Sequence, residues 1–157
     1  MKIRAARSDD LDAIKALLAE NELPVADINL ALLVDFLVAE DVDGKIVGSV
    51  GLERFGRSAL LRSVAIARRA QNEGFGTRLL DHAELMARAS DVSALWLLTT
   101  TAAGFFRRAG YVDVERGSAS AEVQASAQFA ELCPASAVCM KKTVDADIIL
   151  THTPTSD

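Results

Sequence analysis

The sequence predicts an α/β protein with a mixed β-sheet flanked by helices, and two observations carry this prediction. Residues 92–100 form a nearly continuous apolar run, which is typical of a parallel strand buried on both faces. Residues 75–89 have the periodicity of an amphipathic helix, and a glycine turn separates them from a predicted strand at 59–66. Strand, turn, helix and strand in succession are typical of α/β sheets.

The N-terminal part adds a strand and two helices to this pattern. Residues 2–6 form the first predicted strand. Ser8 is the predicted N-cap of a helix, with Asp9 and Asp10 in the first turn, where the helix dipole favours acids. The apolar residues of this helix follow at helical spacing: Leu11, Ile14, Leu17 and Leu18. We expect a second short helix at residues 28–33.

The other predicted elements are strands at 36–41, 45–53, 59–66, from 111 onward and at 136–142, with a short helix at 102–108. Asp43-Gly44 is a strong hairpin signal between the first two of these strands. A second turn at 56–58 leads into the third. Thr101 is the predicted cap of the short helix, which Gly110 ends. The resulting order of elements is β-α-α-β-β-β-α-β-α-β-β, with a loop and a weak helix at 117–130.

The length and composition suit one domain. The chain has 157 residues, half of them apolar and a quarter charged, as in ordinary globular proteins. No apolar run reaches the length of a membrane span, and the N-terminus lacks the apolar run of a signal peptide. We therefore expect a cytoplasmic protein with one domain at 1–142 and a partly flexible tail at 143–157. Cys133 and Cys139 lack metal-ligand spacing, so we expect no metal site.

Charge is distributed unevenly along the chain. The net charge is −5, which disfavours nucleic-acid partners. Residues 54–78 nevertheless contain six arginines and a single acid, Glu73. Such a basic segment in an acidic protein indicates either a specific anionic ligand or a solvated basic surface.

The glycine turn lies between a predicted strand and the N-terminus of the long helix. Gly74 and Gly76 have no Cβ atom, so backbone N–H groups there can approach an anion closely. The first N–H groups of a helix have no internal partner and carry partial positive charge, which favours a phosphate. The pattern is neither a P-loop nor a dinucleotide-binding fingerprint. The alternative is that the glycines only permit a tight turn.

Two blocks in correct order resemble the GNAT (GCN5-related) N-acetyltransferases. The motif of that family is Arg/Gln-x-x-Gly-x-Gly/Ala, and Gln71, Gly74 and Gly76 match it. The second block, Ala102-Ala-Gly-Phe-Phe106-Arg-Arg-Ala-Gly110-Tyr111, is similar to the fourth helix of the family and the segment after it. The resemblance covers residues 1–142. It implies the acyl-CoA N-acyltransferase fold and acetyl-CoA as cosubstrate. It also makes a homodimer a possible assembly, because GNAT proteins are often dimers.

A narrower resemblance is to the GNAT subgroup encoded in bacterial arsenic-resistance operons. It rests on four blocks: Gly51-Leu52-Glu53, Leu60-Leu61-Arg62-Ser63, Leu97-Leu98-Thr99-Thr100-Thr101-Ala102, and Leu132-Cys133-Pro134-x-Ser136-Ala137. This resemblance implies a role near arsenic detoxification. Cys133 and Cys139 then admit two interpretations, as thiols that meet trivalent arsenic or as small apolar residues.

The GNAT resemblance also implies how acetyl-CoA is held. Backbone groups near Val64 and Ile66 would bind the pantetheine arm, and the Val64 N–H would polarise the thioester carbonyl. The loop from Gln71 to Thr77 would hold the pyrophosphate, while Arg68 or Arg69 either reaches further phosphates or is simply exposed. The full set of implied coenzyme-binding residues is Ser63, Val64, Ala65, Ile66, Gln71, Asn72, Glu73, Gly74, Phe75, Gly76, Thr77, Thr99 and Phe106.

Glu53 is the candidate base, and Arg62 is predicted to lie near it. If residues 55–58 form the hairpin turn, Glu53 faces Leu60 and Arg62 is its diagonal neighbour on the same face of the sheet. Glu53 then has three interpretations: it accepts the amine proton, binds a cationic substrate, or only pairs with Arg62. Arg62 itself could bind a substrate carboxylate.

The leaving thiolate has no obvious proton donor. Many GNAT enzymes carry a tyrosine in the fourth helix, but the matching residue here is Phe106, and the chain's one tyrosine is Tyr111. Thr99 replaces a frequent asparagine, and its hydroxyl either contacts the coenzyme or caps the following helix. Water or another group protonates the thiolate, or the chemistry is slow, or the domain only binds acyl-CoA.

The expected function is acetyl-CoA-dependent N-acetylation of a small amine, with a link to arsenic resistance. A peptide or protein amine is the alternative acceptor. The alternative from a different class is a non-catalytic acyl-CoA or metalloid-binding module. We expect no nucleic-acid or membrane partner.

Overall fold

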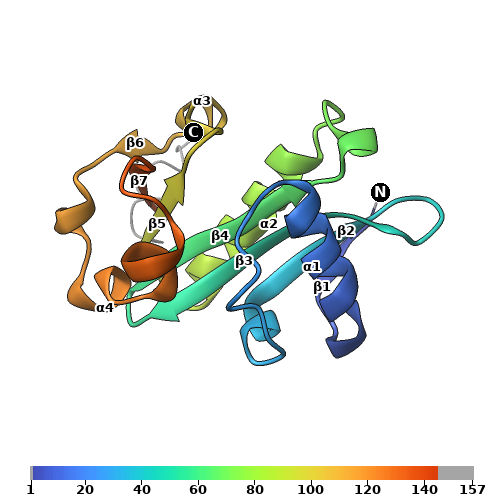
Figure 1. Ribbon diagram of the computed structural model, residues 1–157, viewed down its shortest axis with the longest axis horizontal. Helices are drawn as coiled ribbons and strands as arrows, with labels where there is room; N and C mark the ends of the chain where they lie inside the picture. The colour runs from blue at the N-terminus through green and yellow to red at the C-terminus, as the bar shows by residue number, and fades with distance from the viewer. Residues whose placement is uncertain (1, 145–157) are drawn as a thin grey trace, which may run out of the picture. The chain divides into compact units, whose positions relative to one another are not determined.

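The computed structural model describes residues 2–144, and within them hydrogen bonds join seven strands in the order β1-β2-β3-β4-β5-β7-β6 (Figure 1). The strands are β1 (Lys2–Ala5), β2 (Phe36–Glu40), β3 (Ile46–Phe55), β4 (Ser58–Ile66), β5 (Ala94–Thr99), β6 (Val112–Asp113) and β7 (Val138–Thr143). The α-helices are α1 (Leu11–Glu20), α2 (Phe75–Ala89), α3 (Ala103–Arg108) and α4 (Ala121–Gln124). This is the predicted mixed sheet with flanking helices, and the predicted order of strands along the chain is confirmed.

The described chain divides into two compact units. The first comprises residues 2–53 and 61–83, and the second comprises residues 54–60 and 84–144. The predicted single domain at 1–142 stays a prediction. Strand β7 ends at Thr143, one residue beyond the predicted boundary, and residues 145–157 of the predicted tail lie outside the described residues.

In the first unit, the helices α1 and α2 and the strands β2 and β3 supply most of the core. Ile14, Leu17 and Leu18 are buried, as their helical spacing predicts. β2 and β3 are antiparallel, with Phe36 opposite Gly51. A Cβ atom on Gly51 would lie 2.2 Å from the Phe36 ring, so only glycine fits beneath that aromatic side chain.

The two predictions about helix starts in this unit were wrong. Ser8 does not cap α1. It lies in a 3-10 helix, Ser8–Asp10, because the Asp10 carboxylate accepts from the Arg7 N–H at 2.7 Å and pairs with Arg4 at 2.8 Å. The expected helix at 28–33 is replaced by a later 3-10 helix, Leu32–Asp35. The Asn29 side chain accepts from the Leu32 N–H at 3.0 Å, which starts the turn just before β2 begins.

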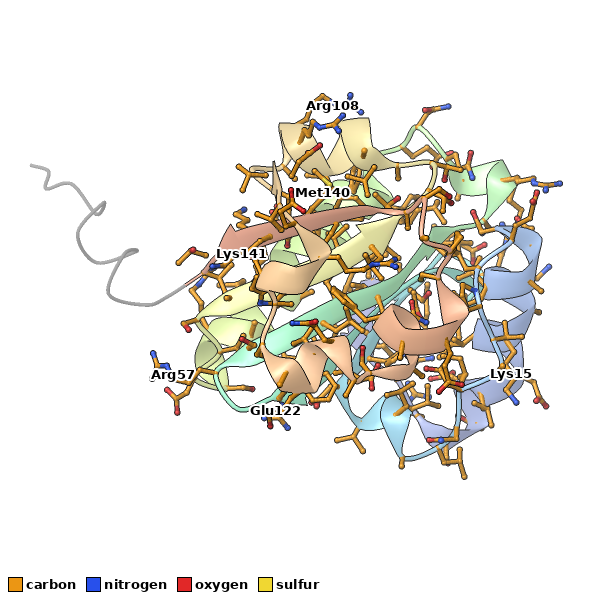
Figure 2. All side chains as sticks on the ribbon, turned by 60° about the vertical axis from the view of Figure 1, so that its left-hand side comes forward. Lys15, Arg57, Arg108, Glu122, Met140 and Lys141 are labelled. Carbon is orange, nitrogen blue, oxygen red and sulfur yellow. The ribbon has the colours of Figure 1, made fainter. Side chains whose placement is uncertain are left out.

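The second unit is built around β5. Residues 58–60 of β4 pair with β5 in parallel, and β7 pairs with the other edge of β5 in antiparallel fashion. Trp96 lies in the core of this unit, as predicted, together with Leu60, Ala119, Val123, Phe129 and Cys139. The Lys141 ammonium, labelled in Figure 2, lies 5.0 Å from the centre of the Trp96 ring, a cation–π distance.

The helix after β5 begins differently from the prediction. The backbone N–H of Ala102 donates to the Thr99 hydroxyl at 3.0 Å, and α3 starts at Ala103. Thr99, rather than the predicted Thr101, therefore accepts the backbone hydrogen bond in the turn that leads into α3. The stretch predicted as a loop with a weak helix contains α4 and begins a π-helical turn, Gln128–Leu132.

Candidate active site

Strand β4 contains one residue with left-handed backbone. Ser63 has φ +56°, a conformation that residues with a side chain rarely adopt inside a strand. Such a residue costs about 1–3 kcal/mol and persists only where neighbouring groups hold it. The backbone therefore departs from regular strand geometry at Ser63, in the middle of the strand that the GNAT resemblance assigns to the pantetheine arm.

Two side chains hold Ser63 in this conformation. The Ser49 hydroxyl, on β3, donates to the Ser63 carbonyl at 2.8 Å, and Ser49 is 0% exposed. The Arg62 Nε donates to the Ser63 hydroxyl at 3.1 Å. The backbone distortion and the serine side chain are thus both fixed from within the first unit.

Arg62 itself is enclosed by two carboxylates. Its guanidinium donates to Asp27 through both terminal nitrogens, one of them at 2.7 Å, and to Glu53 at 2.9 Å. The Arg62 side chain is 1% exposed, whereas those of Asp27 and Glu53 are 21% and 22% exposed. Burial opposes the charge of Arg62, but the hydrogen bonds and charge of Asp27 and Glu53 outweigh it and raise the pKa of the guanidinium.

The structure therefore places Glu53 and Arg62 in contact, as predicted from the hairpin register. The enclosed position of Arg62 favours a structural task over direct contact with an acceptor carboxylate. The groups of this cluster that reach solvent are the two carboxylates. Sequence reasoning missed Asp27, which lies 35 residues away along the chain in a segment without a recognisable motif.

The glycine turn opens α2 as predicted. Gly74 has φ +83°, and a Cβ atom built on it would meet nothing within 4 Å. The Arg78 N–H donates to the Gly74 carbonyl at 3.2 Å, the first hydrogen bond of the helix. The N–H groups of the residues between them have no intrahelical acceptor, and the 15-residue helix adds its dipole. Gly74 and Thr77 are exposed, so these donors lie at the surface.

Two basic side chains near this turn, those of Arg68 and Arg69, have acidic or carbonyl partners. Arg69 pairs with Asp41 at 3.0 Å, and the Arg68 guanidinium donates to the Glu20 carbonyl at 3.1 Å. The Gln71 amide donates to the Ile66 carbonyl at 3.2 Å, which ties the start of the turn to the end of β4. The side chain of Arg69 is 56% exposed, and an exposed pair of this kind contributes at most about 1 kcal/mol. An anionic ligand could therefore displace Asp41 at little cost.

In the second unit, Tyr111 belongs to a buried hydrogen-bond network. Its hydroxyl donates to Glu84 at 3.0 Å, and Lys142 donates to the other oxygen of the same carboxylate at 2.9 Å. Burial and the charge of Glu84 raise the pKa of Tyr111 well above its usual value. Tyr111 therefore keeps its proton, and that proton points at Glu84.

Phe106 and Thr99 have structural contacts in the same unit. Phe106 is 5% exposed, and its ring meets that of Tyr111 edge to face, with centroids 5.7 Å apart. The Thr99 hydroxyl accepts from the Ala102 N–H, as described above. Phe106 is thus a core residue, and Thr99 holds the turn between β5 and α3.

The cysteines also lie in the second unit. Cys139 is buried, and desolvation raises the pKa of its thiol, which favours the interpretation as a small apolar residue. The Cys133 thiol donates to the Gln128 side chain at 3.3 Å. Within residues 2–144 no group of three or more His, Cys, Asp or Glu side chains is placed to hold a metal ion.

None of the helices in the described part of the chain is both long and apolar enough to cross a membrane.

Known proteins resemble this chain in sequence and in structure. An uncharacterized N-acetyltransferase from Chlorobaculum tepidum is 32% identical over 83 residues, which cover 52% of this chain and 52% of the relative. The chain thus spans about half the length of this curated relative. A Mycobacterium tuberculosis protein crystallised with CoA and a second ligand is 25% identical, with a TM-score of 0.76 over 91% of this chain and 99% of that one.

A second solved structure shows the same fold. N-acetylglutamate synthase from Neisseria gonorrhoeae, complexed with coenzyme A and N-acetyl-glutamate, has a TM-score of 0.79 at 22% identity and matches 91% of this chain and 35% of its own. Residues 33–113, just over half of the chain, match the acetyltransferase (GNAT) domain. That range includes Ser63, the glycine turn and Phe106. By its sequence and its fold, the chain belongs to the GNAT acetyltransferase family.

Proposed function

We propose that this protein is an acetyl-CoA-dependent N-acetyltransferase that acts on a small amine. The observation that carries the proposal is the left-handed Ser63 within β4, held by Ser49 and Arg62, with the exposed N-terminus of α2 following it on the chain. A distorted strand with reoriented peptide groups is not needed for a stable sheet, and such strain is typical of functional sites. Family membership and the CoA-bound M. tuberculosis structure support the same conclusion.

The coenzyme would lie along the chain from β4 to α2. Backbone groups of residues 63–66 would bind the pantetheine arm. The loop and first turn from Gln71 to Thr77, with Gly74 leaving the surface open, would bind the pyrophosphate through N–H groups and the helix dipole. The exposed Arg69 would exchange Asp41 for a phosphate oxygen. The residues present therefore fit an acyl-CoA.

The Val64 N–H would stabilise the negative charge that develops on the thioester oxygen. A backbone donor fixed in advance costs no reorganisation during the reaction, and the loss of one such donor typically lowers kcat by about 100- to 1,000-fold. Arg62 and Ser49 hold the peptide that precedes this N–H. Their task in this account is to position it rather than to touch the substrate.

Glu53 would take the proton of the attacking amine, directly or through one water. It is partly exposed, and Arg62 orients its carboxylate through a 2.9 Å hydrogen bond. The two carboxylates around one buried guanidinium carry a net negative charge. This charge suits an acceptor that arrives as an ammonium ion, which must lose a proton before it can attack.

The leaving thiolate would be protonated through water. Tyr111 is held by Glu84, and Phe106 has no proton to donate. The amine nitrogen carries an extra proton once it has attacked the carbonyl, and water can relay that proton to sulfur. The account thus needs no side-chain acid.

A second candidate function is a non-catalytic acyl-CoA or metalloid-binding module. The buried Phe106 and the engaged Tyr111 favour it, because neither can serve as the tyrosine acid of many GNAT enzymes. Both candidate functions predict acyl-CoA binding, but only the enzyme is expected to transfer the acetyl group to an amine.

Thiol release from acetyl-CoA in the presence of an amine panel separates the two. The panel includes amino acids, polyamines, a peptide with a free N-terminus, and amino-acid-like arsenicals, which the resemblance to the arsenic-resistance subgroup makes the first acceptors to test. We expect release above the no-amine rate with at least one small amine. Thermal stabilisation by acetyl-CoA without release for any amine would favour the binding module.

The replacement Glu53→Gln tests the base. Glutamine still accepts from Arg62 but no longer takes a proton, so we expect kcat to fall about 100-fold while the Kd for acetyl-CoA stays nearly unchanged. The matched control is Asp27→Asn, which changes the other, similarly exposed partner of Arg62. Equal losses in both variants would assign the effect to the cluster rather than to proton transfer, and full activity of Glu53→Gln would exclude Glu53 as the base.

The replacement Gly74→Val tests the pyrophosphate site. The open surroundings tolerate the side chain, but valine resists φ +83°, so the N–H groups of the turn should be displaced and the Kd for acetyl-CoA, by calorimetry, should rise about tenfold. Gly56→Val is the control, because Gly56 has φ +67° and equally open surroundings in the β3–β4 turn. Unchanged affinity in Gly74→Val, or an equal loss in Gly56→Val, would contradict the assignment.

A further inference from the structure

We propose that Ser49 is a positioning residue for acetyl transfer. Its hydrogen bond to the Ser63 carbonyl orients and polarises the Val64 N–H, which belongs to the same peptide group. This inference rests on the proposed function. Its observations are the 2.8 Å hydrogen bond from the Ser49 hydroxyl to the Ser63 carbonyl, the complete burial of Ser49 and the left-handed backbone of Ser63.

The direction of the Val64 N–H follows from peptide geometry. The Ser63 carbonyl and the Val64 N–H belong to one planar trans peptide, so they point in opposite directions. A group that fixes the carbonyl therefore fixes the N–H as well. Ser49 pulls the carbonyl toward β3, which turns the N–H of the same peptide away from Ser49.

The surroundings of Ser49 show that a hydroxyl is not needed there for the sheet itself. Ser49 is opposite Val38 in the regular antiparallel register of β2 and β3, and its buried neighbours along the chain include Val47 and Val50. A buried hydroxyl in apolar surroundings costs free energy unless it is hydrogen-bonded. Strand interiors favour β-branched residues, so a serine here is explained by its contact with Ser63.

The hydrogen bond also changes the peptide electronically. A donor on the carbonyl oxygen draws electron density from the amide nitrogen, so the N–H on the other side becomes a stronger donor. Arg62 holds the Ser63 side chain at the same time, through its 3.1 Å hydrogen bond. Arg62 thus restrains the side chain of the distorted residue, while Ser49 restrains its carbonyl.

The alternative is that Ser49 only satisfies a buried carbonyl and so contributes to stability alone. The replacement Ser49→Ala separates the two roles when it is compared with Val38→Ala, which removes packing directly opposite Ser49. If Ser49 only stabilises the fold, both variants should lower Tm, and neither should change kcat or the carbonyl resonance of bound acetyl-CoA. Ser49→Thr, which restores a hydroxyl, serves as the rescue.

The experiment combines kinetics with NMR of bound acetyl-CoA labelled with ¹³C at the thioester carbonyl. In Ser49→Ala we expect kcat to fall about tenfold, less than the loss of a whole oxyanion donor, with the Kd for acetyl-CoA changed less than about twofold. The carbonyl resonance should move toward its position in free acetyl-CoA, and the Val64 amide resonance should move in the free protein. Ser49→Thr should restore these values, and Val38→Ala should leave them unchanged.

The inference is overturned if Ser49→Ala binds acetyl-CoA with unchanged kcat and an unchanged carbonyl resonance, or if Val38→Ala reproduces its effects. A wild-type protein that binds acetyl-CoA but acetylates no amine would defeat the proposed reaction while the carbonyl resonance still decides the role of Ser49. A wild-type protein that binds no acetyl-CoA would overturn both.

Discussion

A buried guanidinium must be paired, and in this protein the pairing of Arg62 determines the geometry of the candidate active site. Taking a charge out of water costs several kcal/mol, so Arg62 can be 1% exposed only while Asp27 and Glu53 stay in place. Its third contact, from Nε to the Ser63 hydroxyl, extends the same restraint to β4. One side chain thus joins the segment after α1, the end of β3 and the distorted centre of β4.

The strained backbone of Ser63 persists because the contacts of this network stabilise it. A left-handed serine costs about 1–3 kcal/mol, whereas removing one partner from a buried ion pair typically costs about 3–5 kcal/mol, so the contacts can outweigh the strain. The peptide is fixed before any ligand arrives, which is what stabilisation of a developing oxyanion requires. In the glycine turn, the other half of the coenzyme site, Gly74 adopts its positive φ freely, and the second left-handed residue is Asn72 (φ +68°), a residue type enriched in that conformation.

Much of this architecture could be predicted from the sequence, since hydrophobic periodicity and turn residues act locally. The bounds of α2 and the contact between Glu53 and Arg62 followed from such signals. Helix starts were harder. Ser8 and Thr101 were plausible caps, but the side chains that bond the backbone at these two helix starts are Asp10, which accepts from the Arg7 N–H, and Thr99, which accepts from the Ala102 N–H. Contacts between distant segments had no local signal at all, as the Arg62–Asp27 pair and the Tyr111–Glu84 hydrogen bond illustrate. The left-handed φ of Ser63 also had none, because serine is not a residue that signals such a backbone.

The central claim is that the Ser63–Val64 peptide is held ready to receive the charge of the thioester oxygen. A crystal structure of the protein with acetyl-CoA tests it most directly, through the distance from the Val64 nitrogen to that oxygen. The account predicts about 2.7–3.1 Å with Ser63 still at positive φ and still bound by Ser49. A thioester oxygen beyond hydrogen-bond distance of Val64, or a Ser63 that relaxes to a regular strand conformation on binding, would contradict it.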